Sequence, residues 1–300
     1  MPILFALVGA TGIGKSNFSL ELAEHYNAEI IGVDSRQIYK GFSIGTAQPD
    51  IQSLNRVRHH LVDFVPPTDN FSAGAFCSLV KNLVAENPEK NFILVGGTGL
   101  YLQSLMLGLP KIPEIEPALR QKIEELVVRD GVDVVYKRAC EVDPEAMEKV
   151  VPGNVQRITR VLEVFESTGR KLSEFQKERE GGVGKLSVFS LQRDRDELYR
   201  RINSRVDQMI EGGWVDEARE LAKTVPLDAP AWQSLGYREL LEAKSHTDLA
   251  RIVENVKQKT RNYAKRQLTW FRWQLDCVPI DMENSEKMMT LQSIFQNSCE

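Results

Sequence analysis

Short, continuously apolar runs separated by glycine-rich turns mark the first third of the chain. Residues 3–8 are apolar throughout, and a turn with three glycines follows at once. The runs 30–33 and 92–95 have the same character, and the second of them enters the glycine turn 96–99. Apolar runs of this length predict strands that are buried on both faces.

A helical period follows the first of these turns. Phe18, Leu22 and Tyr26 recur at steps of four residues and predict a helix over residues 16–26, which leads into the run at 30–33. Strand, glycine turn, helix and strand in this order are typical of an α/β fold with a parallel sheet.

The pattern changes after Pro110. Apolar residues at helical spacing over 119–126 and 155–165 predict two helices, and the polar, glycine-rich run 177–185 predicts a loop. We therefore expect a helical insertion over residues 111–185.

The α/β core is expected to comprise residues 1–110 and 186–280. Residues 188–191 predict a returning strand, 198–210 a helix that ends at two glycines, and 247–273 a long final helix. Residues 281–300 have little periodic apolar content and are expected to form a loose tail.

Composition excludes several classes of protein. The 300 residues are 42% apolar and 27% charged, as is usual for globular chains. No apolar run approaches the roughly 20 residues of a membrane span, and the first residues lack a basic segment followed by a cleavage site, so no secretory signal is expected. None of the four cysteines (Cys77, Cys140, Cys277, Cys299) forms a C-x-x-C pair, which favours a reducing cytoplasm over disulfides or a zinc site.

The charge is unevenly distributed. The chain carries a net charge of −4, yet residues 251–272 hold seven Lys and Arg against one acid, Glu254. Tyr263, Trp270, Phe271 and Trp273 lie among or beside these charges. A solvated helix face explains such a run equally well in general, but cations with interleaved aromatic rings favour contact with RNA.

Residues 9–16 read G-A-T-G-I-G-K-S and match the phosphate-binding pattern G-x-x-x-x-G-K-[ST] in full. Glycines allow the tight turn, backbone N–H groups at the following helix start point at phosphate oxygens, and the lysine adds a mobile charge. The position between a predicted strand and a helix supports this interpretation, which indicates a P-loop NTPase-like core with a parallel sheet flanked by helices, plus the helical insertion. The motif does not say which di- or triphosphate binds.

Asp34 ends a predicted strand, at the sheet edge where ligands bind. Three roles remain open from its position: a Mg²⁺ ligand, a general base beside the phosphate, or a cap of the turn formed with Ser35. Asp63 is a further candidate carboxylate for a metal. The adjacent His59 and His60 would face opposite sides of a strand, so packing is expected for them rather than a joint metal site.

Several motifs together resemble one family, the bacterial tRNA dimethylallyltransferases. They run in family order through residues 3–273 and comprise the phosphate motif, D-S-R-Q-I-Y-K-G at 34–41, I-G-T-A at 44–47, H-H-L-V-D at 59–63, L-V-G-G-T-G-L-Y at 94–101, Q-R-I-T-R at 156–160, L-G-Y-R-E-L at 235–240 and A-K-R-Q-L-T-W-F-R at 264–272. The D-S-R-Q and G-G-T-G-L-Y stretches are far more specific than the phosphate motif alone.

The resemblance implies transfer of a dimethylallyl group from dimethylallyl diphosphate to N6 of adenosine 37 in tRNA, with Mg²⁺ as cofactor. Asp34 would accept the N6 proton, which the resemblance favours over its other two roles. Thr11 would add a hydroxyl near the leaving oxygen, and Lys15 and Arg205 would take up charge on the diphosphate. The diphosphate-binding residues would be Gly9, Ala10, Thr11, Gly12, Ile13, Gly14, Lys15 and Ser16, with Ser16 as the metal ligand.

The resemblance also implies a tRNA-binding surface, with the insertion holding the anticodon stem-loop and the target base flipped out of its stack. A cytoplasmic monomer without membrane contact is expected. The matching positions are Asp34, Ser35, Arg36, Gln37, Thr98, Arg120, Gln156, Arg157, Ile158, Thr159, Arg160, Trp232, Gln233, Ser234, Leu235, Gly236, Tyr237, Lys259, Thr260, Arg261, Asn262, Tyr263, Ala264, Lys265 and Arg266.

Three alternatives stay open at this point. A small-molecule P-loop kinase or NTPase explains the phosphate motif but not the basic aromatic helix. An adenylate isopentenyltransferase would prenylate a free nucleotide without RNA. An RNA-binding protein that kept the loop only as structure would bind tRNA without any product.

Overall fold

The computed structural model describes residues 3–148 and 150–297. Contacts divide the chain into two compact units, one formed by residues 1–104 and 185–300 and the other by residues 105–184. We call them the core unit and the insertion unit, and each is described by itself.

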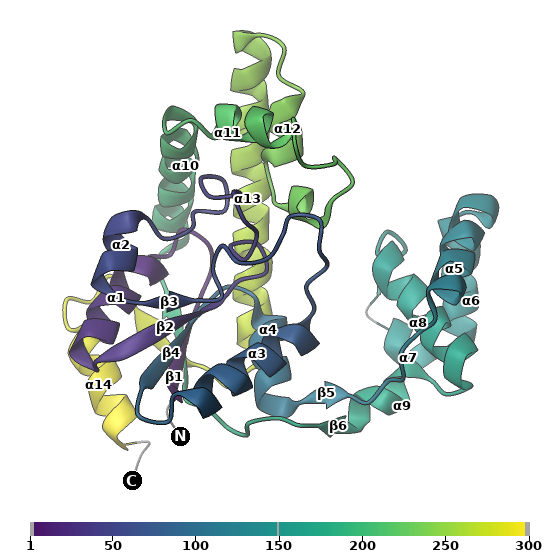
Figure 1. The fold of residues 1–300 in the computed structure, drawn as a ribbon, viewed down its shortest axis with the longest axis horizontal. Helices are drawn as coiled ribbons and strands as arrows, with labels where there is room; N and C mark the ends of the chain where they lie inside the picture. Colours follow the sequence, from purple (N-terminus) through teal and green to yellow (C-terminus); the bar gives the residue numbers. More distant parts are fainter. Residues whose placement is uncertain (1–2, 149, 298–300) are drawn as a thin grey trace. The chain divides into compact units, whose positions relative to one another are not determined.

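The core unit is built on a six-stranded sheet with the strand order β3-β2-β4-β1-β7-β8 (Figure 1). All neighbouring strands pair in parallel. The strands are β1 (Ile3–Val8), β2 (Ala28–Val33), β3 (His59–His60), β4 (Asn91–Gly96), β7 (Val188–Gln192) and β8 (Val278–Asp281). The predicted α/β class with a parallel sheet is confirmed.

Helices surround this sheet and bury its apolar side chains. They are α1 (Lys15–His25), α2 (Ile51–Arg56), α3 (Ala73–Glu86), α4 (Gly99–Leu107, whose end belongs to the insertion unit), α10 (Arg195–Glu211), α11 (Trp214–Leu221), α12 (Tyr237–Leu241), α13 (His246–Gln274) and α14 (Lys287–Asn297), with a 3₁₀ turn at Pro230–Gln233. Phe5 and Leu7 of β1 pack with Leu22 of α1 and Leu198 and Ile202 of α10 in one buried cluster.

A second buried cluster joins the loop after β2 to the helices that follow β7. Phe42 packs against Trp232 and Tyr237, and Trp214 and Val256 belong to the same cluster. This cluster brings residues nearly 200 positions apart in the chain to one wall of the core unit.

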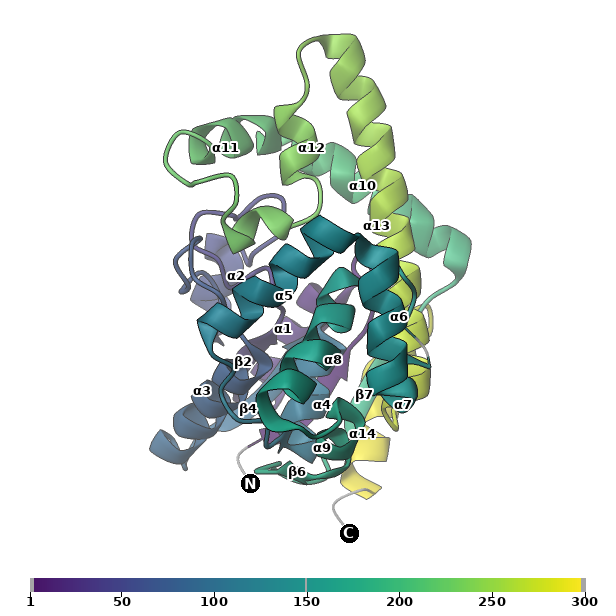
Figure 2. The same cartoon turned by 90° about the vertical axis from the view of Figure 1, so that its right-hand side faces the viewer.

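The insertion unit is a small helical bundle, in which α5, α6 and α8 pack against one another; Figure 2 shows them lengthwise. Its core contains Ile123, Val135, Ile158 and Leu162. Its elements are β5 (Leu109–Pro110), α5 (Pro117–Asp130), α6 (Val132–Val142), α7 (Pro144–Met147), α8 (Val155–Thr168), α9 (Leu172–Lys177) and β6 (Arg179–Glu180), and β5 pairs antiparallel with β6.

Two sequence expectations about local structure are wrong. The run 177–185 is not wholly a loop, since it includes β6. The residues after Asp281 form helix α14 rather than a loose tail, and Leu291 is completely buried in the cluster that contains Phe5. Met288 also packs against this cluster.

Candidate active site

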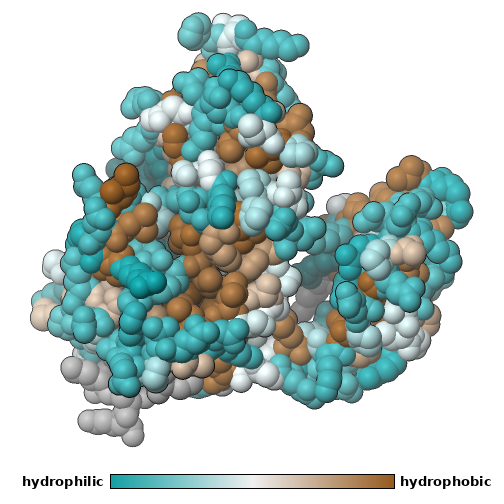
Figure 3. Space-filling view, in the orientation of Figure 1, coloured by the Kyte–Doolittle hydropathy of each residue, from teal (hydrophilic) through white to brown (hydrophobic). Residues whose placement is uncertain are grey.

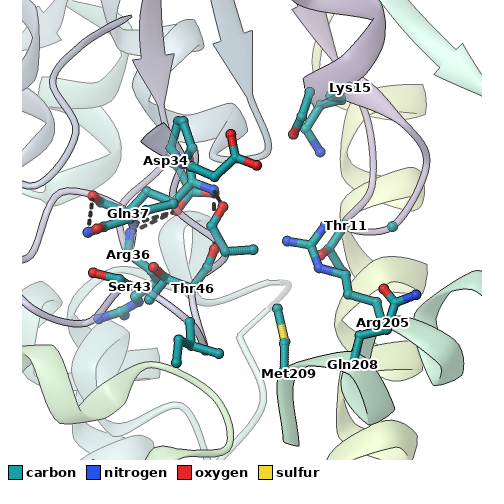
Figure 4. A pocket seen from close by; sticks show the side chains of 18 of the residues that line it. Thr11, Lys15, Asp34, Arg36, Gln37, Ser43, Thr46, Arg205, Gln208 and Met209 are labelled. Carbon is teal, nitrogen blue, oxygen red and sulfur yellow. Dashed lines mark hydrogen bonds between the residues drawn. The ribbon is translucent and has the colours of Figure 1, made fainter. Parts of the chain in front are cut away.

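A cavity of about 1600 Å³ opens in the core unit at the carboxyl ends of the parallel strands. Loops after β1, β2 and β3 line it together with the end of β4 and with α10 and α13. Figure 4 shows Asp34, Arg36 and Gln37 on one wall and Lys15, Thr11 and Arg205 on the facing wall. The strand order makes β2, β4, β1 and β7 neighbours, so motifs far apart in sequence meet at this edge.

The cavity also has an apolar side. Ile44, Val62, Met209 and Leu235 line it in addition to the charged groups. Figure 3 shows apolar residues gathered in the recessed centre of the core unit. The volume of the cavity exceeds the 300–1000 Å³ usual for small-ligand pockets, so the cavity has room for a diphosphate and a second ligand group beside it.

The phosphate loop, residues 9–16, has glycines where its backbone adopts positive φ values. Gly12 and Gly14 have φ values of 78° and 111°, which side chains rarely adopt. The Lys15 ammonium donates to the carbonyls of Gly9 and Ala10, both at 2.9 Å. The Lys15 pKa is lowered to about 8, mainly by burial; the Asp34 carboxylate raises this pKa and the neighbouring Arg205 lowers it, both by less.

Three arginines surround this loop in addition to Lys15. Arg205 lines the cavity, and its pKa is lowered by burial and by Arg201, while Asp34 raises it. Arg201 donates to the Gly12 carbonyl at 3.0 Å, and Arg193 donates to the Ile13 carbonyl at 3.3 Å. Arg201 and Arg193 were missed at the sequence level. Arg201 lies one helical turn before Arg205, a spacing that signals it, whereas Arg193 is signalled only by its place after β7.

One oxygen of the Asp34 carboxylate is used within the fold. Its Oδ1 accepts from the backbone N–H groups of Arg36 at 2.8 Å and Gln37 at 3.3 Å, so it caps the turn after β2. This is the local role that sequence position left open. One oxygen serves the cap, so the other can act on a ligand in the cavity.

The turn after β4 lies against the start of the Asp34 loop. A Cβ on Gly96 would overlap the Val33 carbonyl, so this position requires glycine. The N–H groups of Gly97 and Thr98 donate to that same carbonyl at 3.1 and 3.0 Å. The Thr98 hydroxyl accepts from the Ser35 N–H at 3.0 Å, which joins the two loops directly.

The I-G-T-A loop is anchored by a carboxylate that sequence reasoning missed. Glu217 accepts from the backbone N–H groups of Ser43, Ile44 and Gly45 and from the Tyr237 hydroxyl, the last at 2.6 Å. Burial and the Glu217 carboxylate raise the Tyr237 pKa well above its usual range. Tyr237 is therefore a neutral anchor of this loop.

The motif stretches that are expected to contact tRNA include members with buried side chains. Most of these side chains pack in the interior of their own unit, whereas Ser234 also lines the cavity, and their contact with tRNA stays a prediction. The buried members are Ile158, Thr159, Trp232, Ser234, Tyr237 and Ala264, each at most 7% exposed.

In the insertion unit, two predicted contact residues share one carboxylate. Arg160 lies 3.1 Å and Arg120 lies 3.9 Å from Oε2 of Glu163, which is itself only 6% exposed. Both guanidinium groups are partly exposed, and Arg157 on the same helix is exposed. Glu163 therefore holds Arg120 and Arg160 in place, and both side chains remain accessible to solvent.

Some of the positive charges on α13 are paired with acidic side chains of the protein itself. Lys257 pairs with Asp207 and Glu254, and Lys259 pairs with Glu239. Lys265 and Arg266 are exposed, with Arg266 5.7 Å from the centre of the Tyr263 ring.

The aromatic residues of this segment also divide. Phe271 is 2% exposed and packs inside the core unit, whereas Trp270 is half-buried and lies against Gly99, where a Cβ would overlap its ring. Trp273 is 75% exposed, and Tyr263 lines the cavity.

Metal ligands are sparse in the described residues, where no group of three or more His, Cys, Asp and Glu side chains meets. Asp63 accepts from the Gly41 N–H at 3.0 Å. His59 bonds the Val57 carbonyl, and His60 bonds Glu29 at 2.5 Å. Ser16 lies exposed in the first turn of α1 and lines the cavity.

Cys77, Cys140 and Cys277 are free thiols, whereas Cys299 lies outside the described residues. Among the helices of the described ranges, none is both long enough and apolar enough to cross a membrane.

The lowered pKa of Lys15 predicts a pH dependence for anion binding. The ammonium is charged below pH 8 and neutral above it, so the Kd for inorganic diphosphate should rise up to about tenfold per pH unit above 8. The Lys15→Arg variant is the control. Its side chain stays charged throughout this range, so any pH dependence of its Kd comes from the titration of diphosphate and of the other protein groups. Calorimetric titration from pH 7 to 9.5 measures both. Identical pH profiles for the two proteins would contradict the assignment.

Comparison with known proteins agrees with this geometry. The family described as IPP transferase matches residues 37–274. The chain is 40% identical over 292 residues to a tRNA dimethylallyltransferase of Bacillus subtilis, covering 94% of this chain and 93% of that protein. It is 39% identical over 277 residues to one of Halothermothrix orenii, covering 90% and 84%.

Solved structures point the same way. A tRNA isopentenylpyrophosphate transferase of Bacillus halodurans superposes with a TM-score of 0.70 at 33% identity, covering 98% of this chain and 95% of that one. A eukaryotic dimethylallyltransferase acting on tRNA superposes with a TM-score of 0.81 at 28% identity, covering 97% and 77%. With its family match over most of its length and with these relatives, the chain belongs to the IPP transferase family.

Proposed function

We propose that the protein transfers a dimethylallyl group from dimethylallyl diphosphate to N6 of adenosine 37 in tRNA. The observation that carries this proposal is that Asp34 and the cations Lys15 and Arg205 face each other within one cavity, which apolar side chains also line. The apolar side chains suit an isoprenoid, the cations suit its diphosphate, and the carboxylate suits an amine that must lose a proton.

The reaction would use these groups as follows. The N6 lone pair forms a bond to the allylic carbon as the C–O bond to the diphosphate breaks, and the diphosphate leaves with that electron pair. The N6 proton passes to the free oxygen of Asp34. Lys15, Arg205 and the Thr11 hydroxyl stabilise the negative charge that develops on the leaving oxygen.

The residues present fit a magnesium ion bound mainly through the substrate. Mg²⁺ usually takes one or two protein ligands and completes its octahedron with phosphate oxygens and water. The exposed hydroxyl of Ser16 beside the phosphate loop fits such a ligand, and a bound ion would neutralise part of the diphosphate charge. Asp63 also lines the cavity; its Oδ1 accepts from the Gly41 N–H, which leaves its other oxygen as a further candidate ligand.

The protein would act on tRNA in the cytoplasm, as a monomer. The exposed positions Gln156, Arg157 and Arg120 of the insertion unit, and Gln233, Lys265 and Arg266 of the core unit, are available for it. Adenosine 37 would leave its stack to reach Asp34, which lies inside the cavity.

Nucleoside analysis tests the proposal directly. The protein is incubated with unmodified tRNA, Mg²⁺ and dimethylallyl diphosphate, and the digested tRNA is examined by mass spectrometry. We expect N6-dimethylallyladenosine at position 37 and release of one diphosphate. Prenylation of free AMP, ADP or ATP without RNA, or ATP turnover without tRNA, would contradict the proposal, as would tight tRNA binding with no product.

Neutralising Lys265 and Arg266 tests the tRNA-facing part of α13. The double variant Lys265→Gln/Arg266→Gln should bind tRNA more weakly and with a flatter salt dependence, because fewer counterions are released; the slope falls by roughly 0.7–0.9 per lost contact. Filter binding from 50 to 300 mM salt measures it. Arg195→Gln/Lys223→Gln, exposed charges elsewhere in the core unit, is the matched control. An unchanged slope would remove this segment from the interface.

A further inference from the structure

Gln267 is a buried polar residue of α13 that none of the proposed chemistry uses. It is 7% exposed, and both ends of its side-chain amide are engaged. Its Oε1 accepts from the Thr11 N–H at 2.9 Å, and its Nε2 donates to the Gly97 carbonyl at 3.0 Å. One side chain thus bridges two active-site segments that lie 86 positions apart in the sequence.

The bridge continues from Gly97 to the catalytic carboxylate. Gly97 and Thr98 donate to the Val33 carbonyl, and the Thr98 hydroxyl accepts from the Ser35 N–H. Val33 and Ser35 are the two chain neighbours of Asp34. A continuous path of hydrogen bonds therefore runs from the phosphate loop through Gln267 to both sides of Asp34.

The surrounding structure leaves Gln267 little freedom to move. A Cβ on Gly97 would overlap the Gln267 amide nitrogen, so a glycine is required for this approach. On the same helix, Ala264 is completely buried and Trp270 packs onto Gly99. The buried position of Gln267 on α13 and its two hydrogen bonds fix the amide between the two segments.

Only an amide satisfies both partners at once. A carboxylate in this place accepts from the Thr11 N–H but cannot donate to the Gly97 carbonyl, and an apolar side chain leaves both backbone groups unpaired. The Thr11 N–H is directed at Gln267, so this bond also fixes the orientation of the peptide that carries the Thr11 side chain.

We propose that Gln267 is a positioning residue for prenyl transfer, holding the phosphate loop and the Asp34 loop at the separation that the reaction requires. The proposal rests on the proposed function, since it concerns the distance between donor and acceptor groups. A misplacement of about 1 Å in such a site costs on the order of 100-fold in rate.

The test compares Gln267→Met with Gln267→Glu and with the control Gln274→Met, an exposed glutamine seven residues later on α13. We expect Gln267→Met to lower kcat about 100-fold, with tRNA affinity within twofold of the parent protein and a cooperative thermal transition. Gln267→Glu, which is of nearly equal size, should lose as much. The control should keep full activity.

A double variant separates positioning from mere packing. Thr98→Val breaks the same path of hydrogen bonds at its next step, so Gln267→Met combined with Thr98→Val should lose less than the product of the two single effects. Steady-state and single-turnover rates with saturating tRNA and dimethylallyl diphosphate measure this. If Gln267→Met unfolds, Gln267→Glu with Thr98→Val carries the same comparison.

The outcomes distinguish the two proposals. A parent protein that makes no prenylated tRNA refutes the proposed function. A parent that makes it, with a kcat for either folded Gln267 variant within threefold of the parent, refutes the positioning role. Independent, multiplicative losses in the double variant refute it as well.

Discussion

Replacing Asp34 with asparagine should lower kcat by about 10³-fold while leaving tRNA affinity nearly unchanged. General base catalysis contributes typically 10²–10⁴-fold, and an amide cannot accept the N6 proton. Asparagine keeps an oxygen for the N–H groups of Arg36 and Gln37, so the turn after β2 should persist. Single-turnover rates with saturating tRNA, together with filter binding, measure the two quantities.

The alanine variant separates the two functions of this carboxylate. Asp34→Ala removes the cap as well as the base, so it should lose activity like the asparagine variant and also lose about 1 kcal/mol of stability. Activity retained by Asp34→Asn but lost by Asp34→Ala would make Asp34 a cap alone. Asp216→Asn on α11, an exposed carboxylate far along the chain, serves as the control.

Replacing Arg205 with glutamine should impair catalysis and yet leave the protein at least as stable. Burial is the main cause that lowers the Arg205 pKa, and it outweighs the opposing effect of the Asp34 carboxylate, so the buried guanidinium charge is unfavourable in the free protein. Removing this charge relieves the fold, whereas the reaction loses a group that stabilises the leaving diphosphate, which costs on the order of 10²–10³-fold. Stored instability of this kind is common at functional sites.

Thermal unfolding and kcat/KM for dimethylallyl diphosphate test this second prediction together. The melting temperature of Arg205→Gln should equal or exceed that of the parent protein, and kcat/KM should fall. Arg195→Gln changes an exposed arginine at the start of the same helix, outside the cavity lining, and should alter neither quantity. A variant with a lower melting temperature and unchanged kcat/KM would show that Arg205 stabilises the fold instead.

The strands and the phosphate loop were predictable because their signals are local. A run such as 3–8, short and followed at once by a glycine turn, is typical of a strand buried on both faces, and the glycines of that turn adopt positive φ values. The roles of Gln267 and Glu217 were not predictable, because each depends on a partner more than 170 positions away. Motif stretches also mislead: Lys265 and Ala264 are neighbours in sequence, but one is exposed and the other lies in the core.

Helix α13 has a consequence for how this chain can vary among organisms. Val256 packs beside Tyr237, Gln267 reaches the phosphate loop, and Trp270 lies on Gly99, all along one unbroken helix. Inserting or deleting a single residue between Val256 and Gln267 would rotate the rest of the helix by about 100°. Gln267 and Trp270 would then lose their contacts with the phosphate loop and with Gly99. Evolution along this segment is therefore confined to exchanges of side chains at constant length, and changes in length must fall in the surface loops.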